Sequence, residues 1–265
     1  MTGSRRGLFL PPFDPFADPA RVGDLAARAE EAGWDGVFVW DHLRYREPVA
    51  AIADPWVCCA AIAARTQRLL FGPMVTPLPR RRPHVVARAA ASLATMSGGR
   101  LVLGFGIGDD TGGEFGAFGD ERDARVRGAM LDEGLDVLTA LLGGEPVRHE
   151  GPYYLADDVR FLPAPEHPIP IWIAGRHGNA APLRRAARYD GAFVIGIPGP
   201  DALDDVRGPI AERRGSLEGY DVVVDLPVGE DPAPWAAAGA SWVLTRVGPY
   251  RMDADAVLAV VDAGP

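Results

Sequence analysis

The most informative absence in this 265-residue chain is lysine, because all 27 basic residues are arginine. Without lysine, the protein cannot form a Schiff base, attach pyridoxal phosphate or use the lysine of a phosphate-binding P-loop. The histidines stand singly, and neither a His-x-His nor a His-Glu-x-x-His spacing occurs, so no metal site is predicted. The Gly-x-Ser-x-Gly motif of many hydrolases is also lacking.

Other absences restrict location and partners. The two cysteines, Cys58 and Cys59, are adjacent in an apolar helical pattern, which predicts buried thiols rather than a disulfide. No apolar run approaches the roughly 18 residues of a membrane-spanning helix, and the first residues lack the apolar core of a signal peptide. The net charge of -9 disfavours nucleic acid and anionic membranes as partners. We therefore expect a cytoplasmic protein that binds a small-molecule substrate.

What the chain does contain is an alternation of short apolar runs, typical of buried parallel strands, with longer segments of helical periodicity. The predicted strands span 7–10, 36–40, 69–75, 101–106, 170–174, 191–195, 221–225 and 241–247. The predicted helices span about 19–32, 54–65, 83–98, 122–142, 180–188, 201–214, 232–238 and 253–261. Eight such units predict one α/β domain over residues 1–265, a (β/α)8 TIM barrel.

Two further segments bear on this fold. A doubly wound open sheet is the rival, but Pro11-Pro12-Phe13 after the first strand cannot form the glycine-rich turn of a dinucleotide fold. The proline-rich segment 143–169 departs from the βα rhythm, and its part 147–162 predicts an exposed hairpin. This hairpin is expected between the fourth helix and the fifth strand.

The stretch from Gly33 to His42 indicates where the chemistry lies. It consists of a helix stop at Gly33, a continuous apolar strand and, where the strand ends, the titratable pair Asp41 and His42. Parallel sheets carry their active sites at the carboxyl ends of the strands, so this pair is a candidate catalytic site. The alternative is that Asp41 caps the next turn and His42 only makes a hydrogen bond in a loop.

Small residues at later strand ends suggest a large, flat ligand that carries phosphate. Gly104 to Asp109 holds part of a dinucleotide-type glycine pattern, and Ala174 to Asn179 joins a strand to a helix start beside Arg176. Asp190 to Gly196 adds small residues at the next strand end. The alternative is that small residues let strand and helix pack closely. The run Arg80-Arg81-Arg82 is interpreted as a solvated face, in preference to an attractor for an anionic cofactor tail.

Together these segments resemble the luciferase-like monooxygenase family of flavin- and deazaflavin-dependent oxidoreductases, which are built on a (β/α)8 barrel. The resemblance covers nearly the whole chain and rests on the order and spacing of several stretches. These are residues 29–42 (AEEAGWDGVFVWDH), 72–77 (GPMVTP), 97–104 (SGGRLVLG), 127–138 with MLDEGL inside it, 170–175 (PIWIAG) and 185–191 (RAARYDG).

The resemblance implies reduced flavin mononucleotide (FMN) or coenzyme F420 over the barrel mouth. His42 would face the reactive ring as general acid or base, tuned by Asp41 if that carboxylate reaches it. A non-proline cis peptide is implied at Pro73–Met74 or Met74–Val75. The residues implied for cofactor binding are Met74, Val75, Thr76, Gly106, Gly108, Ala174, Gly175, Arg176, His177, Ile195 and Gly196. The motifs do not separate the two cofactors, although arginine without lysine suggests a GC-rich genome, which favours F420.

The implied activity is hydride transfer or monooxygenation on a small organic substrate that the sequence does not identify. The chain is short for the family and has no room for the long loop that follows the seventh strand in larger members. Oxygen chemistry on a flavin needs a closed, dry site, whereas hydride transfer depends on it less. The alternatives are a non-catalytic flavin- or ligand-binding barrel and a hydrolase that uses Asp41 and Asp109. A homodimer is common in the family, and the oligomeric state stays open.

Overall fold

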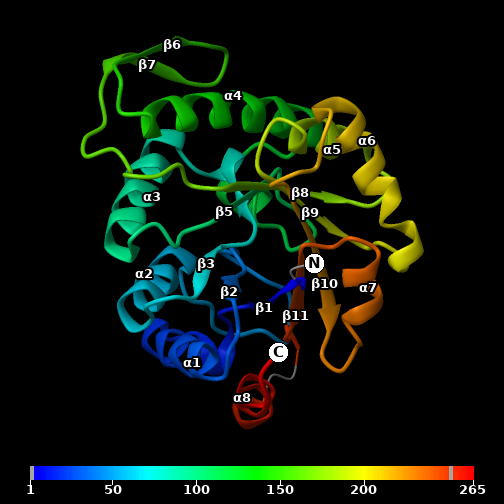
Figure 1. Cartoon of the computed structure of the whole chain (residues 1–265). Coiled ribbons are helices and arrows are strands. Elements are labelled where there is room, and N and C mark those ends of the chain that lie inside the picture. The colour runs from blue at the N-terminus through cyan, green and yellow to red at the C-terminus, as the bar shows by residue number, and fades with distance from the viewer. Residues whose placement is uncertain (1–2, 251–252) are drawn as a thin grey trace.

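In the computed structural model, which describes residues 3–250 and 253–265, parallel strands form a nearly closed barrel inside a layer of helices (Figure 1). The barrel strands are β1 Arg5–Leu10, β2 Gly36–Val39, β3 Leu70–Pro73, β4 Thr76–Pro77, β5 Leu103–Gly106, β8 Ile171–Arg176, β9 Gly191–Ile195, β10 Asp221–Pro227 and β11 Trp242–Arg246. The α-helices are α1 Pro19–Glu31, α2 Pro55–Arg65, α3 Pro83–Ser97, α4 Ala124–Leu142, α5 Ala180–Ala186, α6 Asp204–Arg214, α7 Ala233–Ala237 and α8 Ala254–Ala263. Short 3-10 helices are η1 Asp14–Phe16, η2 Leu78–Arg80, η3 Gly116–Phe118 and η4 Pro200–Ala202. The predicted TIM-barrel fold is confirmed.

The sheet follows the order β3-β2-β1-β11-β10-β9-β8-β5-β4, and all neighbouring strands are parallel. The predicted strand 69–75 is divided into β3 and β4 at Met74–Val75, whose peptide bond is cis. The ring of strands meets itself at this division. Phe71 of β3 forms a bridge with Leu101 ahead of β5, and β4 pairs with β5.

Side chains on each strand alternate between an outer core and an inner core. On β2, Val37 and Val39 belong to the outer core that packs against the helices, whereas Phe38 belongs to the inner one. Phe38 meets Trp172 and Trp242 inside the barrel, with ring centroids 5.1 to 5.6 Å apart. Because rings of this size fill the interior, a ligand has to bind at the mouth.

The helices begin and end at residues that satisfy their free backbone groups. Asp18, Asp54, Asp123 and Asp253 precede α1, α2, α4 and α8, and each carboxylate accepts backbone N–H groups of the first turn. The helix α3 ends at Gly98, which has the left-handed backbone conformation (φ 64°) that glycine adopts without strain. Among the described residues, no helix has the length and apolar character needed to cross a membrane.

The predicted hairpin is present between α4 and β8, outside the barrel (green, upper left in Figure 1). Its strands β6 (Val147–Glu150) and β7 (Leu155–Val159) are antiparallel. Glu133 of α4 holds it in place by accepting the backbone N–H of Tyr154 at 2.8 Å and pairing with Nε2 of His149 at 3.0 Å.

A substitution at Gly72 tests the barrel closure. A Cβ on Gly72 of β3 would lie 1.7 Å from the backbone oxygen of Val102, a position that neither strand can relieve by rotating a side chain. We expect Gly72→Ala to lower the free energy of unfolding by more than about 3 kcal/mol. In Gly208→Ala, the control in α6, the added Cβ meets nothing within 4 Å, so this variant should gain about 0.5–1 kcal/mol. Urea denaturation followed by circular dichroism measures both, and equal stability of the two variants would contradict this account.

Candidate active site

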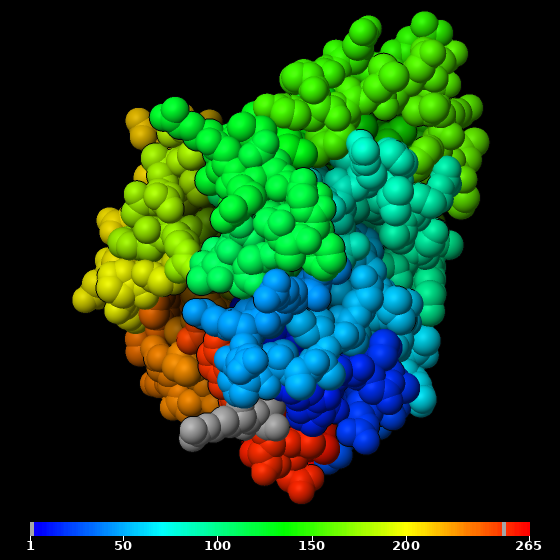
Figure 2. Space-filling view, turned by 180° about the vertical axis from the view of Figure 1, so that it is seen from behind, coloured from blue at the N-terminus to red at the C-terminus, as the bar shows by residue number. Residues whose placement is uncertain are grey.

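A cavity of about 730 Å³ opens at the carboxyl ends of the barrel strands, a size typical of ligand sites. The barrel strands contribute Phe9, Gly106, Ala174, Gly175, Arg176, Phe193, Ile195, Asp225 and Arg246 to its lining. Met74 and Val75 between β3 and β4, Arg80 of η2, and the loop residues Trp40, Asp41, His42, Tyr45, Gly108, Asp109 and Glu114 line it as well, among others. Figure 2 shows the segment that follows β2 (light blue) lying beside the segment that follows β5 (green). The two are close, since a Cβ on Gly112 would lie 3.6 Å from the backbone oxygen of Arg44.

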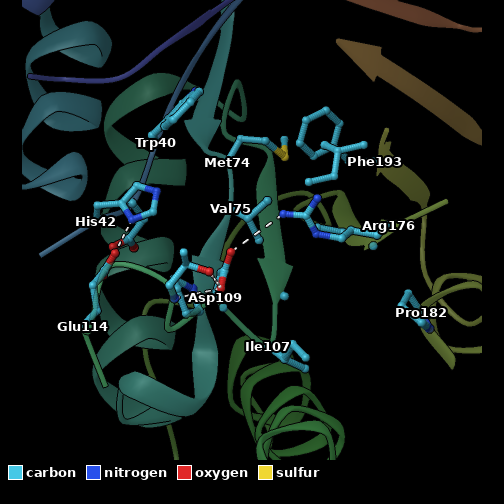
Figure 3. A pocket seen from close by; sticks show the side chains of 18 of the residues that line it. Trp40, His42, Met74, Val75, Ile107, Asp109, Glu114, Arg176, Pro182 and Phe193 are labelled. Atoms are coloured by element: carbon cyan, nitrogen blue, oxygen red, sulfur yellow. Dashed lines mark hydrogen bonds and ion pairs between the residues drawn. The ribbon is translucent and has the colours of Figure 1, made fainter. Parts of the chain in front are cut away.

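The floor of the cavity is made of small residues from β5, from β8 and from the turn between β3 and β4. A Cβ on Gly106 of β5 would lie 3.0 Å from Cγ1 of Val75 and 3.5 Å from Cβ of Ala174. Gly106 therefore packs closely against Val75, and any larger residue would crowd this part of the floor. Val75 follows the cis peptide bond and stands near the centre of the cavity (Figure 3). This floor suits a flat ring system.

Aromatic and sulfur-containing side chains form one wall of the cavity. Phe9 and Phe193 meet edge to face at 5.3 Å between centroids, and Trp40 lies 5.2 Å from Phe9. Met74 lies beside Phe193 in Figure 3. Apolar walls of this kind bury the body of a ligand and leave its orientation to a few polar groups.

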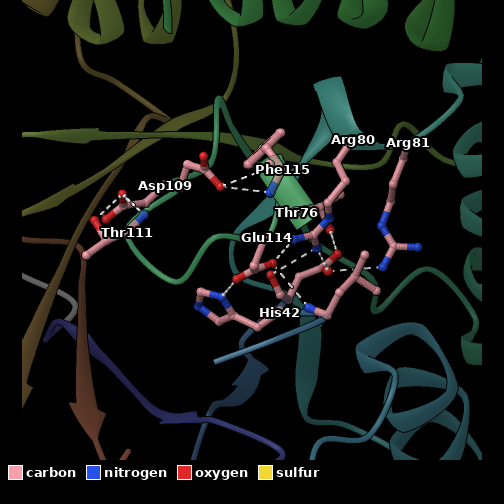
Figure 4. A network of polar contacts seen from close by, with 12 residues as sticks. His42, Thr76, Arg80, Arg81, Asp109, Thr111, Glu114 and Phe115 are labelled. Atoms are coloured by element: carbon pink, nitrogen blue, oxygen red, sulfur yellow. Dashed lines mark hydrogen bonds and ion pairs between the residues drawn. The ribbon is translucent and has the colours of Figure 1, made fainter. Parts of the chain in front are cut away.

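His42 is the principal polar group at the edge of this wall. Its Nδ1 forms a hydrogen bond with Oε1 of Glu114, which lies in the loop between β5 and α4 (Figures 3 and 4). Glu114 is 2% exposed at its side chain, whereas His42 is 26% exposed and lines the cavity. The ring of Tyr45 stands edge-on to His42 at 4.9 Å, and burial raises the pKa of Tyr45 above its ordinary value. His42 therefore presents its other nitrogen, Nε2, to a ligand.

Asp41 borders the cavity, and its side chain, which is 0% exposed, belongs to a buried ionic cluster. Its carboxylate accepts hydrogen bonds from Arg80 at 2.6 Å, Arg81 at 3.0 Å and the hydroxyl of Thr76 at 2.8 Å. The partner of His42 is Glu114, so the structure supports a positioning role for Asp41 rather than direct contact with the imidazole. The interpretation of the arginine run as a solvated face is wrong for Arg80, whose side chain is 2% exposed and bridges Asp41 to Glu114.

Most of the residues implied for cofactor binding do line the cavity. These are Met74, Val75, Gly106, Gly108, Ala174, Gly175, Arg176 and Ile195. Three others do not: Thr76 is fully buried beneath Asp41, His177 pairs through Nε2 with Asp205 at 2.9 Å, and Gly196 lies outside the lining. The rule that sites lie at strand ends therefore predicts which residues are near the mouth of the barrel. It does not predict which of their side chains line the cavity.

Two of the glycines have packing reasons that are independent of any ligand. A Cβ on Gly175 would lie 2.4 Å from Cβ of Pro182, and one on Gly108 would lie 2.7 Å from the ring of Phe115. Gly108 also has a positive φ of 75°, which favours glycine. For these two positions the close-packing alternative accounts for the residue.

Arg176 and Asp109 face each other across the outer part of the cavity (Figure 3), with Nη2 and Oδ2 3.8 Å apart. Burial by itself would raise the pKa of Asp109, but hydrogen bonds from the Thr111 hydroxyl and N–H, with the charge of Arg176, lower it overall. The carboxylates of Asp41 and Asp109 are thus each held by other donors, which removes the support for a hydrolase that uses them as a pair.

Two functional candidates were missed by the sequence patterns. Glu114 stands in a loop without periodicity, and its position after a strand end was the only available signal. Asp225 of β10 is 5% exposed at its side chain, and Nη1 of Arg246 lies 2.9 Å from its Oδ2. Burial raises the pKa of Asp225, and Arg246 opposes that shift. The pair adds a charge-compensated polar patch to the cavity.

Comparison with known proteins agrees with this geometry. Residues 4–256 match the family model of the luciferase-like monooxygenases. The F420-dependent glucose-6-phosphate dehydrogenases of Nakamurella multipartita and Beutenbergia cavernae are each 35% identical to this chain, over 223 and 218 residues. The matches cover 80% and 77% of this chain, but only 64% and 62% of those relatives. The chain therefore spans less than two thirds of the length of either.

Solved structures share the same fold. An F420-dependent secondary alcohol dehydrogenase in complex with an F420–acetone adduct has a TM-score of 0.82 and 19% identity, with 98% of both chains covered. The FMN-bound oxygenating constituent of 3,6-diketocamphane monooxygenase from Pseudomonas putida has a TM-score of 0.69 and 22% identity, over 84% of this chain and 67% of that one. With a family model that matches almost the whole chain, the protein belongs to the luciferase-like monooxygenase family.

Proposed function

We propose that the protein is a coenzyme F420-dependent oxidoreductase that interconverts a small alcohol and its carbonyl compound. The observation that carries this proposal is the His42–Glu114 pair, which holds a proton-transfer group at the edge of a cavity with a flat floor. Coenzyme F420, when bound, supplies the acceptor or donor of a hydride. The relatives that are 35% identical to this chain carry F420-dependent names, which favours F420 over FMN.

The cavity fits such a cofactor in shape and in charge. Val75, Gly106 and Ala174 line the cavity with small or absent side chains, which supports the placement of a flat tricyclic ring over them. Arg176 is 66% exposed at the outer part of the cavity and would hold a phosphate of the cofactor. The apolar wall with Phe9 and Phe193 would exclude water from the reacting carbon.

His42 performs the proton chemistry in this proposal. Glu114 bonds to Nδ1, so Nε2 is the nitrogen that meets the substrate. During alcohol oxidation, the hydroxyl proton passes to Nε2 of His42 while the C–H hydride leaves the same substrate and a carbonyl forms. In the reverse direction, the protonated Nε2 returns the proton to the alkoxide oxygen. A positioned acid or base of this type contributes about 10²- to 10⁴-fold to a rate.

FMN-dependent monooxygenation is the second candidate, because a structure of that activity shares the fold. The connection from β10 to α7 spans only residues 228–232, so it supplies no long cover for the mouth. Oxygen chemistry on a flavin depends on excluding water, whereas hydride transfer tolerates a more open site. The short connection therefore supports hydride transfer.

Replacement of His42 tests its catalytic role. We expect His42→Ala to lower kcat by about 10²- to 10⁴-fold, because no other group at this position accepts the substrate proton. F420 affinity, followed by fluorescence titration, should change little. His84→Ala on the exposed face of α3 is the matched control and should leave both quantities unchanged. Wild-type turnover in His42→Ala would remove His42 from the mechanism, and cofactor binding without any turnover would favour a non-catalytic binding barrel.

Enlargement of Gly106 tests the position of the ring. We expect Gly106→Val to abolish F420 binding, because its side chain would occupy the space between Val75 and Ala174. Gly112→Ala, whose Cβ would make only ordinary contacts of 3.6 Å and more, serves as the control. Parallel titrations with F420 and FMN, together with a melting curve of each variant, separate lost binding from lost folding. A folded Gly106→Val that binds either cofactor as tightly as the wild type would refute this placement.

A further inference from the structure

Arg80 links the two buried carboxylates at the cavity. It ends η2, the turn that follows β4, and this turn carries its side chain inward until only 2% of it is exposed. Nη2 donates to Oδ1 of Asp41 at 2.6 Å and to its backbone oxygen at 3.3 Å. Nη1 donates to Oε2 of Glu114 (Figure 4). One guanidinium therefore joins the loops that follow β2, β4 and β5.

The charges of this cluster balance. Asp41 and Glu114 supply two carboxylates, and Arg80 and Arg81 supply two guanidinium groups. Arg81 also faces the more exposed Asp54, with Nη2 and Oδ2 3.7 Å apart, so the two buried carboxylates are matched by two guanidinium groups at the edge of the cavity. A buried carboxylate keeps its charge only when such partners replace the lost water. Without Arg80, the buried carboxylate of Glu114 would lose its main compensating charge.

The donors around Glu114 fix its hydrogen bonds in one direction. Arginine can only donate, so Oε2 accepts from Arg80, and it also accepts the N–H of Leu43 at 3.1 Å. The remaining oxygen, Oε1, meets Nδ1 of His42. An ionised Glu114 has no proton to give there, so Nδ1 has to carry the proton of this bond.

We propose that Arg80 is a positioning residue that keeps the proton of His42 on Nδ1 and thereby leaves the lone pair of Nε2 free in the cavity. Arg80 acts through Glu114 and does not touch the substrate. Its loss allows a protonated Glu114 to donate to Nδ1, which moves the imidazole proton to Nε2 and blocks that nitrogen as a base. This inference rests on the proposed function in one respect only, which is that Nε2 of His42 serves as the base in the reaction.

The other groups around His42 do not account for this choice of nitrogen. Phe13 and Trp40 contact the imidazole as rings, with centroids 6.0 and 5.9 Å away. Burial raises the pKa of Tyr45 above its ordinary value, so its phenol is neutral near pH 7. The carboxylate of Asp41 is bonded to Thr76, Arg80 and Arg81, and Arg80 connects it to the partner of His42. The ionic contact of Nδ1 is with Glu114, whose charge depends on Arg80.

The test reads the histidine tautomer directly in the protein without cofactor. Long-range ¹H–¹⁵N spectra of ¹⁵N-histidine-labelled protein at about pH 8, where ordinary histidines are neutral, distinguish a protonated Nδ1 from a protonated Nε2. His42→Asn assigns the signals. We expect His42 to be protonated on Nδ1 in the wild type and in Arg80→Lys, and on Nε2 in Arg80→Met. Arg122→Met is the matched control, because Arg122 pairs with Asp110 in the same loop but is 74% exposed.

A second variant guards against misfolding of Arg80→Met. In Glu114→Gln, Arg80 and the N–H of Leu43 draw the amide oxygen toward themselves, so the amide N–H₂ faces Nδ1 of His42. We expect the proton of His42 to move to Nε2 in this variant. A proton that stays on Nδ1 in folded Arg80→Met or in Glu114→Gln would overturn the proposal. A wild-type His42 protonated on Nε2 would overturn it as well.

The outcomes separate this inference from the proposed function. If F420 does not bind, the tautomer result still decides the role of Arg80. If His42→Ala loses turnover but the tautomer does not respond, the proposed function stands and the role of Arg80 falls. In the active enzyme, Arg80→Met should lower kcat by at least about 100-fold, with little change in KM or F420 affinity, and Arg80→Lys should recover part of it.

Discussion

The bridge from Arg80 to Asp41 and Glu114 is the interaction on which the mouth of the barrel depends. It joins three loops that follow neighbouring strands, and each loop contributes to the cavity. Removing one partner from a buried ionic cluster costs about 3–5 kcal/mol, because the remaining charge loses its compensation. The same contacts that hold the loops also orient His42. The contacts of Arg80 therefore have two effects, since they hold the loops together and place the proton of His42.

The sequence was sufficient to predict the fold because its local signals agree with one another. Apolar runs such as Gly36–Val39 alternate with helices that open at aspartate or proline, and this rhythm alone predicts a (β/α)8 barrel. The position of His42 followed from the same rule, since parallel strands present their ends at one face. The hairpin after α4 matches the sequence prediction, and the cis peptide at Met74–Val75 is at one of the two bonds that the family resemblance implied.

The pairing of side chains could not be predicted, because it depends on contacts between distant segments. His42 and Glu114 are 72 residues apart, and no periodicity links them. Arg80 lies in a run of arginines that is typical of an exposed face, yet its side chain is buried at the mouth of the barrel. Gly175 lines the cavity as the resemblance implied, but its closeness to Pro182 is a packing reason for glycine that the sequence did not reveal. To predict the role of a residue at a strand end, one needs to know the direction of its side chain as well as its position in the chain.

Burial divides the charged groups of the cavity into two zones that differ in their response to ionic strength. The cluster around Arg80 is nearly inaccessible, with Asp41 at 0% and Glu114 at 2% exposure, so dissolved ions cannot screen it. Arg176 and Asp109 are 66% and 57% exposed at the outer part of the cavity, within reach of dissolved ions. Salt therefore weakens the attraction between Arg176 and Asp109, and with it the phosphate binding proposed for Arg176, while the inner electrostatic field around His42 stays constant.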